Sequence, residues 1–137
     1  MIYDILESKL IADGFQAGFD LFRNHMPADI SVGVMTRVTL QGLPIDPHIP
    51  GYYRGEMQVI TRHSDRRLGD VMAARVQRIL EVTGGHTTYP ANDERGEVTL
   101  DLFQPITLPI NFPRLSGNGF EFSQHFKCVF GMKRLPL

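Results

Sequence analysis

The stretch that decides the fold reads YYRGEMQVITRHSD at residues 52–65 and RRLGDVMAARVQRIL at residues 66–80. Apolar and polar side chains alternate over 55–63, which predicts a β-strand, because successive side chains of a strand point to opposite faces. In the second part, apolar residues recur every three or four positions, as on one face of an amphipathic helix. Asp65 precedes this helix and is a preferred N-cap residue. We therefore expect a strand, a capped turn and a long helix in direct succession.

The helix that follows Asp65 is predicted to bury a single apolar stripe. The residues of this stripe are Leu68, Val71, Met72, Val76, Ile79 and Leu80. Gly84 and Gly85 are expected to end the helix, because glycine adopts the backbone conformations that helix ends require. The polar residues 86–96 then read as a loop.

Segments on either side of this stretch complete the predicted fold. Residues 32–40, 97–102 and 120–132 alternate with period two and are expected to be strands. Residues 2–13 carry apolar side chains at helical spacing. Residues 15–27 fit either a short helix or a connector that Pro27 ends.

The expected fold class is α+β, built as one domain over residues 1–137. Its mostly antiparallel four-stranded sheet carries two helices packed on one face, in the order α-β-β-α-β-β. The other face of the sheet bears charged side chains, so we expect it to meet either solvent or another subunit.

Composition restricts the classes of function. Apolar residues make up 42% of the chain, and the net charge is −1, so no strong field draws the protein to nucleic acid or to an anionic membrane. The single cysteine, Cys128, allows no intrachain disulfide, which fits a reducing compartment. The first residues lack the basic segment of a signal peptide, and no apolar run is long enough to span a bilayer. We expect a soluble protein that is cytoplasmic when it is made.

The residues that could carry chemistry do not form a convincing site. The five histidines, which lie at positions 25, 48, 63, 86 and 125, lack the spacing of a metal site, so we expect no metal and no cofactor. His63 and Asp65 could act as a general base with its orienting carboxylate, in a small hydrolase or ligand-binding domain. The cap reading explains Asp65 fully and is favoured. Cys128 reads as a buried apolar residue rather than a nucleophile.

Two loops are unusually apolar, and we expect them to be the working surfaces. The first is the loop 41–55, and the second is the arm 104–115, in which Pro105, Pro109 and Pro113 exclude helix and central strand. The predicted interface residues are Ile45, Ile49, Tyr52 and Tyr53 in the loop, and Ile106, Leu108, Ile110 and Phe112 in the arm. Leu115 belongs to the same apolar arm. The alternative for the arm is that it folds back over the sheet.

The order of elements over residues 1–83 resembles a known family. Its parts are DLFRNHMP at 20–27, a loop that contains Gly42 and ends in GYYR at 51–54, and the strand MQVITR at 57–62 before the Asp65-capped helix. Together they resemble the tail terminator proteins of long-tailed bacteriophages, which are also called tail completion or minor capsid proteins. Residues 84–137 match this family only in strand content.

The resemblance implies a structural virion protein and no enzyme. It implies a hexameric ring at the head-proximal end of the tail, which stops polymerisation of the tail tube protein and offers a surface to the head connector. DNA passes through the lumen without specific binding, and no membrane is involved. The alternative within this setting is another neck or head-completion component.

Overall fold

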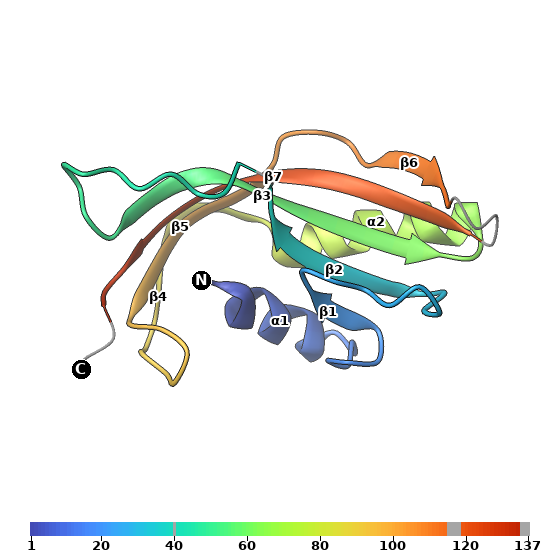
Figure 1. Ribbon diagram of the computed structural model, residues 1–137, viewed down its shortest axis with the longest axis horizontal. Coiled ribbons are helices and arrows are strands. Elements are labelled where there is room, and N and C mark those ends of the chain that lie inside the picture. Colours follow the sequence, from blue (N-terminus) through green and yellow to red (C-terminus); the bar gives the residue numbers. More distant parts are fainter. Residues whose placement is uncertain (40, 115–118, 135–137) are drawn as a thin grey trace.

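The computed structural model describes residues 1–39, 41–114 and 119–134. It contains two helices and seven strands (Figure 1). In chain order they are α1 (Tyr3–Ala12), β1 (Leu21–Arg23), β2 (Gly33–Val38), β3 (Tyr52–His63), α2 (Arg66–Leu80), β4 (Val82–Tyr89), β5 (Val98–Pro105), β6 (Ile110–Pro113) and β7 (Phe120–Met132).

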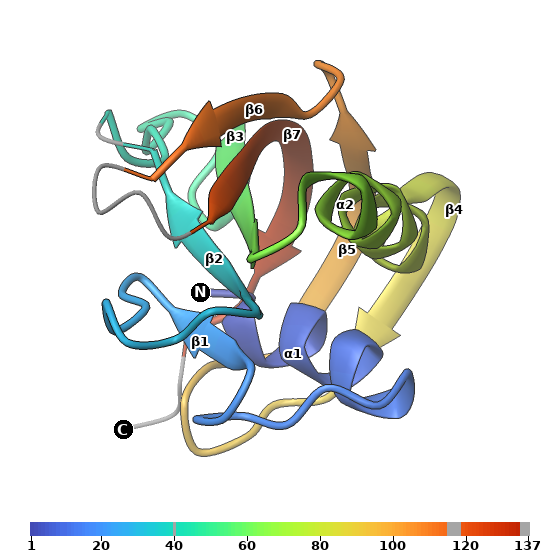
Figure 2. The ribbon, with the colours of Figure 1, turned by 90° about the vertical axis from the view of Figure 1, so that its right-hand side faces the viewer.

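All seven strands form one mixed sheet. The strand order is β1-β2-β3-β7-β5-β4, and β6 pairs with β7 outside this path. The β1–β2 pair is parallel and the other pairs are antiparallel. The sheet is strongly curved, and both helices lie on its concave side (Figure 2).

The long strand β7 joins the two halves of the sheet. On one side it pairs with all of β3, from Tyr52 opposite Gly131 to His63 opposite Phe120. On its other side, residues 120–123 pair with β6 and residues 126–132 pair with β5. Neither β5 nor β6 is bonded to β3, so β7 holds the sheet together.

The prediction of a four-stranded sheet in the order α-β-β-α-β-β was wrong. The four expected strands correspond to β2, β3, β5 and β7, but β1, β4 and β6 are additional. Within the described residues, 15–27 form no helix and contain the three-residue β1. β6 is extended, as the prolines of the arm require, and it lies at a sheet edge where missing N–H groups are tolerated.

The strand β4 replaces the predicted helix end and the loop after it. The helix α2 already ends at Leu80, and the chain continues directly into β4. Gly84 and Gly85 have φ values of +134° and +76° and lie where the register between β4 and β5 shifts. The two glycines thus form a bulge within a strand, because their freedom at positive φ serves a bulge as well as a helix end.

The apolar stripe of α2 is also displaced from the predicted one. The buried residues are Gly69, Ala73, Val76 and Leu80, whereas Leu68 is half exposed and Val71 is 63% exposed. A Cβ atom at Gly69 would lie only 2.4 Å from the Phe122 ring. The first turn of α2 therefore sits so close to β7 that only glycine fits there, and the bulkier neighbours face outward.

Candidate interface surfaces

The arm is held along the edge of the sheet by its backbone. Ile106 N–H donates to the His125 carbonyl at 3.0 Å, and β6 pairs with β7 from Ile110 opposite Ser123 to Pro113 opposite Phe120. The Gln124 side chain also donates to the Thr107 carbonyl at 3.0 Å. The backbone of the arm therefore folds back on the sheet, as the alternative prediction stated.

The apolar side chains of the arm nevertheless remain largely exposed. Leu108 is 82% exposed and Phe112 is 50% exposed, and Ile106 and Ile110 are exposed to a similar degree as Phe112. Large apolar side chains on a fixed backbone lose little conformational freedom when they bind a partner, which favours an interface role. Leu115, which the sequence placed in the same arm, lies outside the described residues, as does Leu40 at the end of the predicted strand 32–40.

The loop between β2 and β3 supplies the second apolar surface. Ile45 and Ile49 are both more than half exposed. Tyr52 and Tyr53 belong to β3 rather than to the loop. They point to opposite faces, and the Tyr53 ring packs on Phe130 with centroids 5.2 Å apart, so Tyr53 supports the core.

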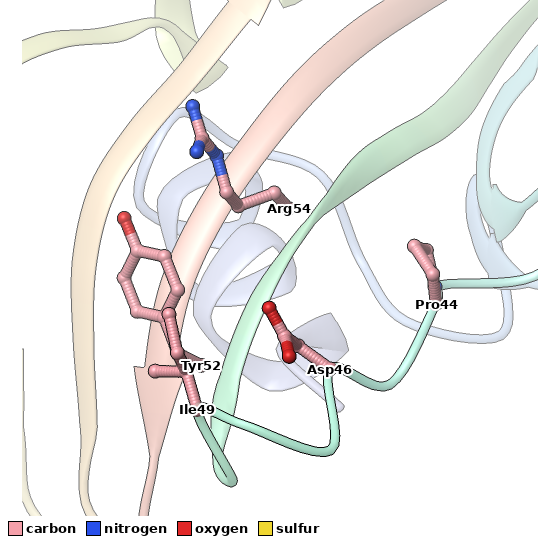
Figure 3. Close-up of a pocket in the computed structure, with 5 residues that line it drawn as sticks. All are labelled: Pro44, Asp46, Ile49, Tyr52 and Arg54. Carbon is pink, nitrogen blue, oxygen red and sulfur yellow. The ribbon is translucent and has the colours of Figure 1, made fainter.

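The loop folds over the start of β3 and encloses a groove (Figure 3). The groove has a volume of about 330 Å³ and is lined by Pro44, Asp46, Ile49, Tyr52 and Arg54. Its apolar wall combines a proline, an isoleucine and a tyrosine ring, and its polar rim carries one acid and one base. The sequence prediction included Ile49 and Tyr52 but missed the other three residues, which no apolar pattern could reveal.

The structure does not bring the two predicted surfaces together. The loop adjoins Tyr52, which pairs with Gly131 at one end of β7, whereas the arm pairs with residues 120–123 at the other end. In Figure 1 the loop lies at the left end of the long axis, and β6 lies toward the right end. One chain thus carries two different apolar surfaces on opposite sides.

Between them lies the convex face of the sheet, which is polar. The Arg37 guanidinium donates to the Gln58 side chain at 2.6 Å, and Gln58 donates in turn to the Ser123 hydroxyl at 2.6 Å. His125 lies 3.5 Å from the Glu56 carboxylate. Charged and amide side chains therefore satisfy one another on this face, whereas the apolar surfaces stand at its ends.

The Asp65 side chain caps α2, and its hydrogen bond with His63 is made by the Asp65 backbone. The Nδ1 atom of His63 accepts a hydrogen bond from the backbone N–H of Asp65 at 2.9 Å, and the Asp65 carboxylate accepts from Leu68 N–H at 2.9 Å. That capping bond is the main cause that lowers the pKa of Asp65. The structure confirms the favoured reading of Asp65 as the N-cap of α2.

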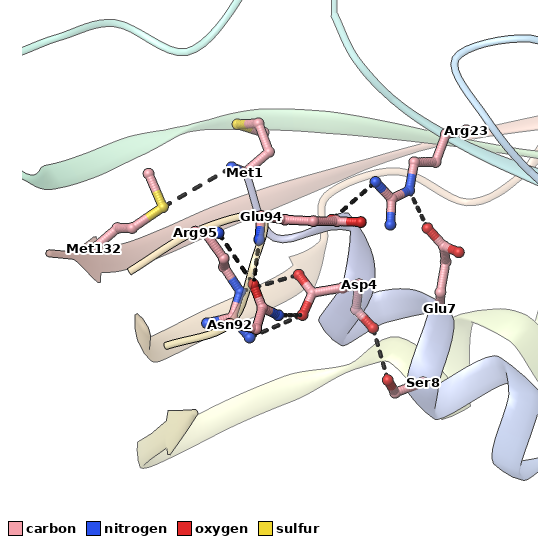
Figure 4. A network of polar contacts seen from close by, with 9 residues as sticks. All are labelled: Met1, Asp4, Glu7, Ser8, Arg23, Asn92, Glu94, Arg95 and Met132. Carbon is pink, nitrogen blue, oxygen red and sulfur yellow. Dashed lines mark hydrogen bonds and ion pairs between the residues drawn. The ribbon is translucent and has the colours of Figure 1, made fainter. Parts of the chain in front are cut away.

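A buried polar cluster near α1 has a structural role (Figure 4). Arg95, whose side chain is 4% exposed, donates two hydrogen bonds to the Asp4 carboxylate, at 3.0 and 2.9 Å, and one each to the carbonyls of Pro90 and Gly96. Burial alone raises the pKa of Asp4, but the hydrogen bonds and charge of Arg95 hold it below its usual value. This cluster fastens α1 to the chain between β4 and β5.

The remaining residues that could carry chemistry are buried in the core or stay apart from one another within the described ranges. Cys128 is buried, and burial raises the pKa of its thiol to about 12, which confirms it as a core residue. No group of three potential metal ligands converges within the described residues. None of the helices in this part of the chain combines the length and the apolar character needed to cross a bilayer.

Among the described residues, five exposed large apolar side chains lie outside both predicted surfaces: Ile11, Phe19, Val32, Leu68 and Val71. Val71 projects from α2, and Phe19 and Val32 share a shallow depression beside β1. The sequence placed Val71 in the α2 stripe, Val32 in the strand 32–40 and Phe19 in the segment 15–27, which fitted either a short helix or a connector. These residues offer matched controls for the loop and the arm.

Comparison with known proteins adds no relative. A scan against protein-family models gave no match, and a search of curated proteins gave none either.

Proposed function

We propose that the protein is a non-catalytic virion component that caps the head-proximal end of a bacteriophage tail tube. In this proposal it forms a hexameric ring, ends polymerisation of the tail tube protein and presents a surface to the head connector. DNA passes through the lumen without specific binding. The proposal rests first on the resemblance of residues 1–83 to tail terminator proteins, through the motifs at 20–27, 51–54 and 57–62.

The structural observation that carries the proposal is the arm. Its side chains of Ile106, Leu108, Ile110 and Phe112 are exposed while its backbone is fixed by hydrogen bonds to β7. Exposed apolar patches on a rigid element are typical of protein interaction sites. A ring also needs two different patches on each subunit, and this chain carries two at opposite ends of β7.

Polymerisation of the tail tube protein tests the proposal directly. Added at substoichiometric amounts, the protein is expected to stop tube growth and to remain at one tube end, as seen by electron microscopy. The double variant Leu108→Ser/Phe112→Ser is expected to lose this effect, because it removes the apolar surface of the arm without touching the core. Val71→Ser removes an exposed aliphatic side chain elsewhere and is expected to retain it.

Two results distinguish a tail terminator from the alternative virion components. Tubes that grow at the normal rate and length in the presence of the wild-type protein would refute a terminator role. Binding to the head connector without any effect on the tube would instead identify another neck or head-completion component.

A further inference from the structure

The arm cannot reach the groove of its own chain. Its backbone is bonded to residues 120–123 and, through Ile106, to His125, whereas the groove lies beside Tyr52 and Arg54, opposite Gly131 and Val129. Even the nearest of these positions, His125 and Val129, are four residues apart on one strand, or roughly 13 Å at 3.3 Å per residue, which is more than a leucine side chain spans. Any contact between the arm and the groove must therefore join two molecules.

The two surfaces fit each other in shape and in polarity. The arm protrudes and carries no charged residue from Pro105 to Pro113, whereas the groove is hollow, has an apolar wall and bears one acid and one base on its rim. An uncharged apolar arm enters such a site without burying an unpaired charge of its own. The groove volume of about 330 Å³ is at the lower end of sites that enclose small ligands.

Hydrogen-bonding groups also complement each other. Among the described residues no strand pairs with the far side of β6, so alternate carbonyls of the arm face outward there. Pro109 and Pro113 contribute no N–H groups, and the edge therefore presents more acceptors than donors. Arg54 on the groove rim forms no ion pair within the described ranges and supplies donors for such carbonyls.

The same prolines disfavour the alternative of joining subunits by strand addition. An edge on which Asn111 keeps an outward N–H but Pro109 and Pro113 have none extends a sheet poorly, and the bulge at Gly84 and Gly85 interrupts the opposite edge at β4. Side-chain insertion is the contact that remains for the arm.

We propose that the arm of one copy inserts into the groove of a second copy, in a head-to-tail contact led by Leu108 and received by Ile49 and Tyr52. This inference deepens the proposed function and rests on it for its setting in a closed ring. The contact is heterologous, so each copy gives one arm and receives another.

Mixing two defective variants tests this pairing. Leu108→Asp places a charge on the arm and leaves the groove intact. Ile49→Asp places a charge in the groove and leaves the arm intact. Both residues are exposed, so both variants are expected to fold, which circular dichroism checks. Each variant alone is expected to be monomeric in native mass spectrometry, with self-association weakened by about tenfold or more.

The mixture is expected to form a heterodimer that grows no further, because it contains only one intact arm–groove contact. Val71→Asp is the matched control and is expected to assemble like the wild type. The inference is overturned by a mixture that stays monomeric, by either variant assembling normally, or by a wild-type chain that is monomeric up to millimolar concentration.

Failure of the proposed function gives a different result. If the heterodimer forms but the wild-type protein leaves tail tubes unaffected, the arm–groove contact is supported and the terminator role is refuted. If tube growth stops but the mixture stays monomeric, the terminator role is supported and the arm–groove contact is refuted.

Discussion

Phe126 and Phe112 show how differently the two sides of this sheet are used. Phe126 is fully buried on the concave side and stacks on Phe103 with ring centroids 4.6 Å apart. Phe112 sits on the edge strand β6 and is 50% exposed. The buried side chains on the concave side therefore stabilise the fold, whereas the apolar side chains of the arm and the loop are exposed and available for contacts. Substitutions should affect stability or association, but rarely both.

The largest loss of stability is expected from Phe126→Ala. Removing a buried ring leaves a cavity and lowers the free energy of unfolding by about 3–5 kcal/mol. Phe112→Ala deletes the same group from the arm and should change stability by less than about 0.5 kcal/mol. Urea unfolding of both variants measures the contrast, and equal losses would contradict the division between the two sides.

Arg95→Ala is expected to cost about 3 kcal/mol of unfolding free energy, because it leaves the Asp4 carboxylate and two carbonyls without their buried donor. Arg95→Lys keeps the charge but cannot form the two-pronged contact, and an intermediate loss is expected. Thermal unfolding measures both. An unchanged Tm in Arg95→Ala would show that the cluster does not fasten α1.

The same cluster should make stability depend on acid pH. Arg95 lowers the folded-state pKa of Asp4 below the ordinary value of 3.8 for this carboxyl group, so the ionised carboxylate stabilises the fold above that pH. This contribution is lost as the pH falls through the folded-state pKa. The stability difference between the wild type and Arg95→Ala should therefore narrow below about pH 4. A constant difference from pH 7 to pH 3 would contradict this.

Loss of the helix cap should have a smaller effect. Asp65→Ala removes the acceptor for Leu68 N–H and should lower the midpoint of unfolding by less than Arg95→Ala does. Asp65→Asn retains a capping oxygen and should recover most of this loss. Guanidinium unfolding measures the two variants. If His63→Ala abolished an activity in the folded protein, the reading of this turn as purely structural would be wrong.

The smallest effect on stability is expected on the loop. Ile49→Ser and Ile45→Ser both change exposed residues and should shift unfolding free energy by less than about 0.5 kcal/mol. Only Ile49 lines the groove, so its variant should weaken self-association more than the Ile45 variant does. Sedimentation at several concentrations compares them, and equal weakening would make the whole loop, rather than the groove, the contact.

Elements with a strong periodic pattern could be predicted from the sequence. The alternation before His63, the cap at Asp65 and the long final strand were all found near their observed bounds. β4 was missed because it is an exposed edge strand without apolar alternation, and its two glycines gave the signal of a helix end. β6 was missed because its prolines are tolerated only at an edge, which the sequence does not identify.

The candidate surfaces could likewise be predicted only in part from the sequence. Apolar residues without an element of their own pointed to the arm and the loop. The groove could not be foreseen, because Asp46 and Arg54 approach Ile49 only when the loop folds over β3. Leu68 and Val71 were predicted to be buried, but both are exposed. They face outward because α2 packs closely on Phe122 at Gly69, and this tertiary contact leaves no mark in the sequence pattern.

The position of β7 in the chain has a consequence for synthesis. The ribosome makes β3 and β5 before β7, yet neither strand bonds to the other, and β6 also waits for its partner. Until residues 120–132 emerge, the nascent chain holds two unconnected part-sheets. The arm lies along one end of β7, and the strand that carries the groove is anchored at the other end. A chain interrupted before Phe120 thus offers neither surface in finished form.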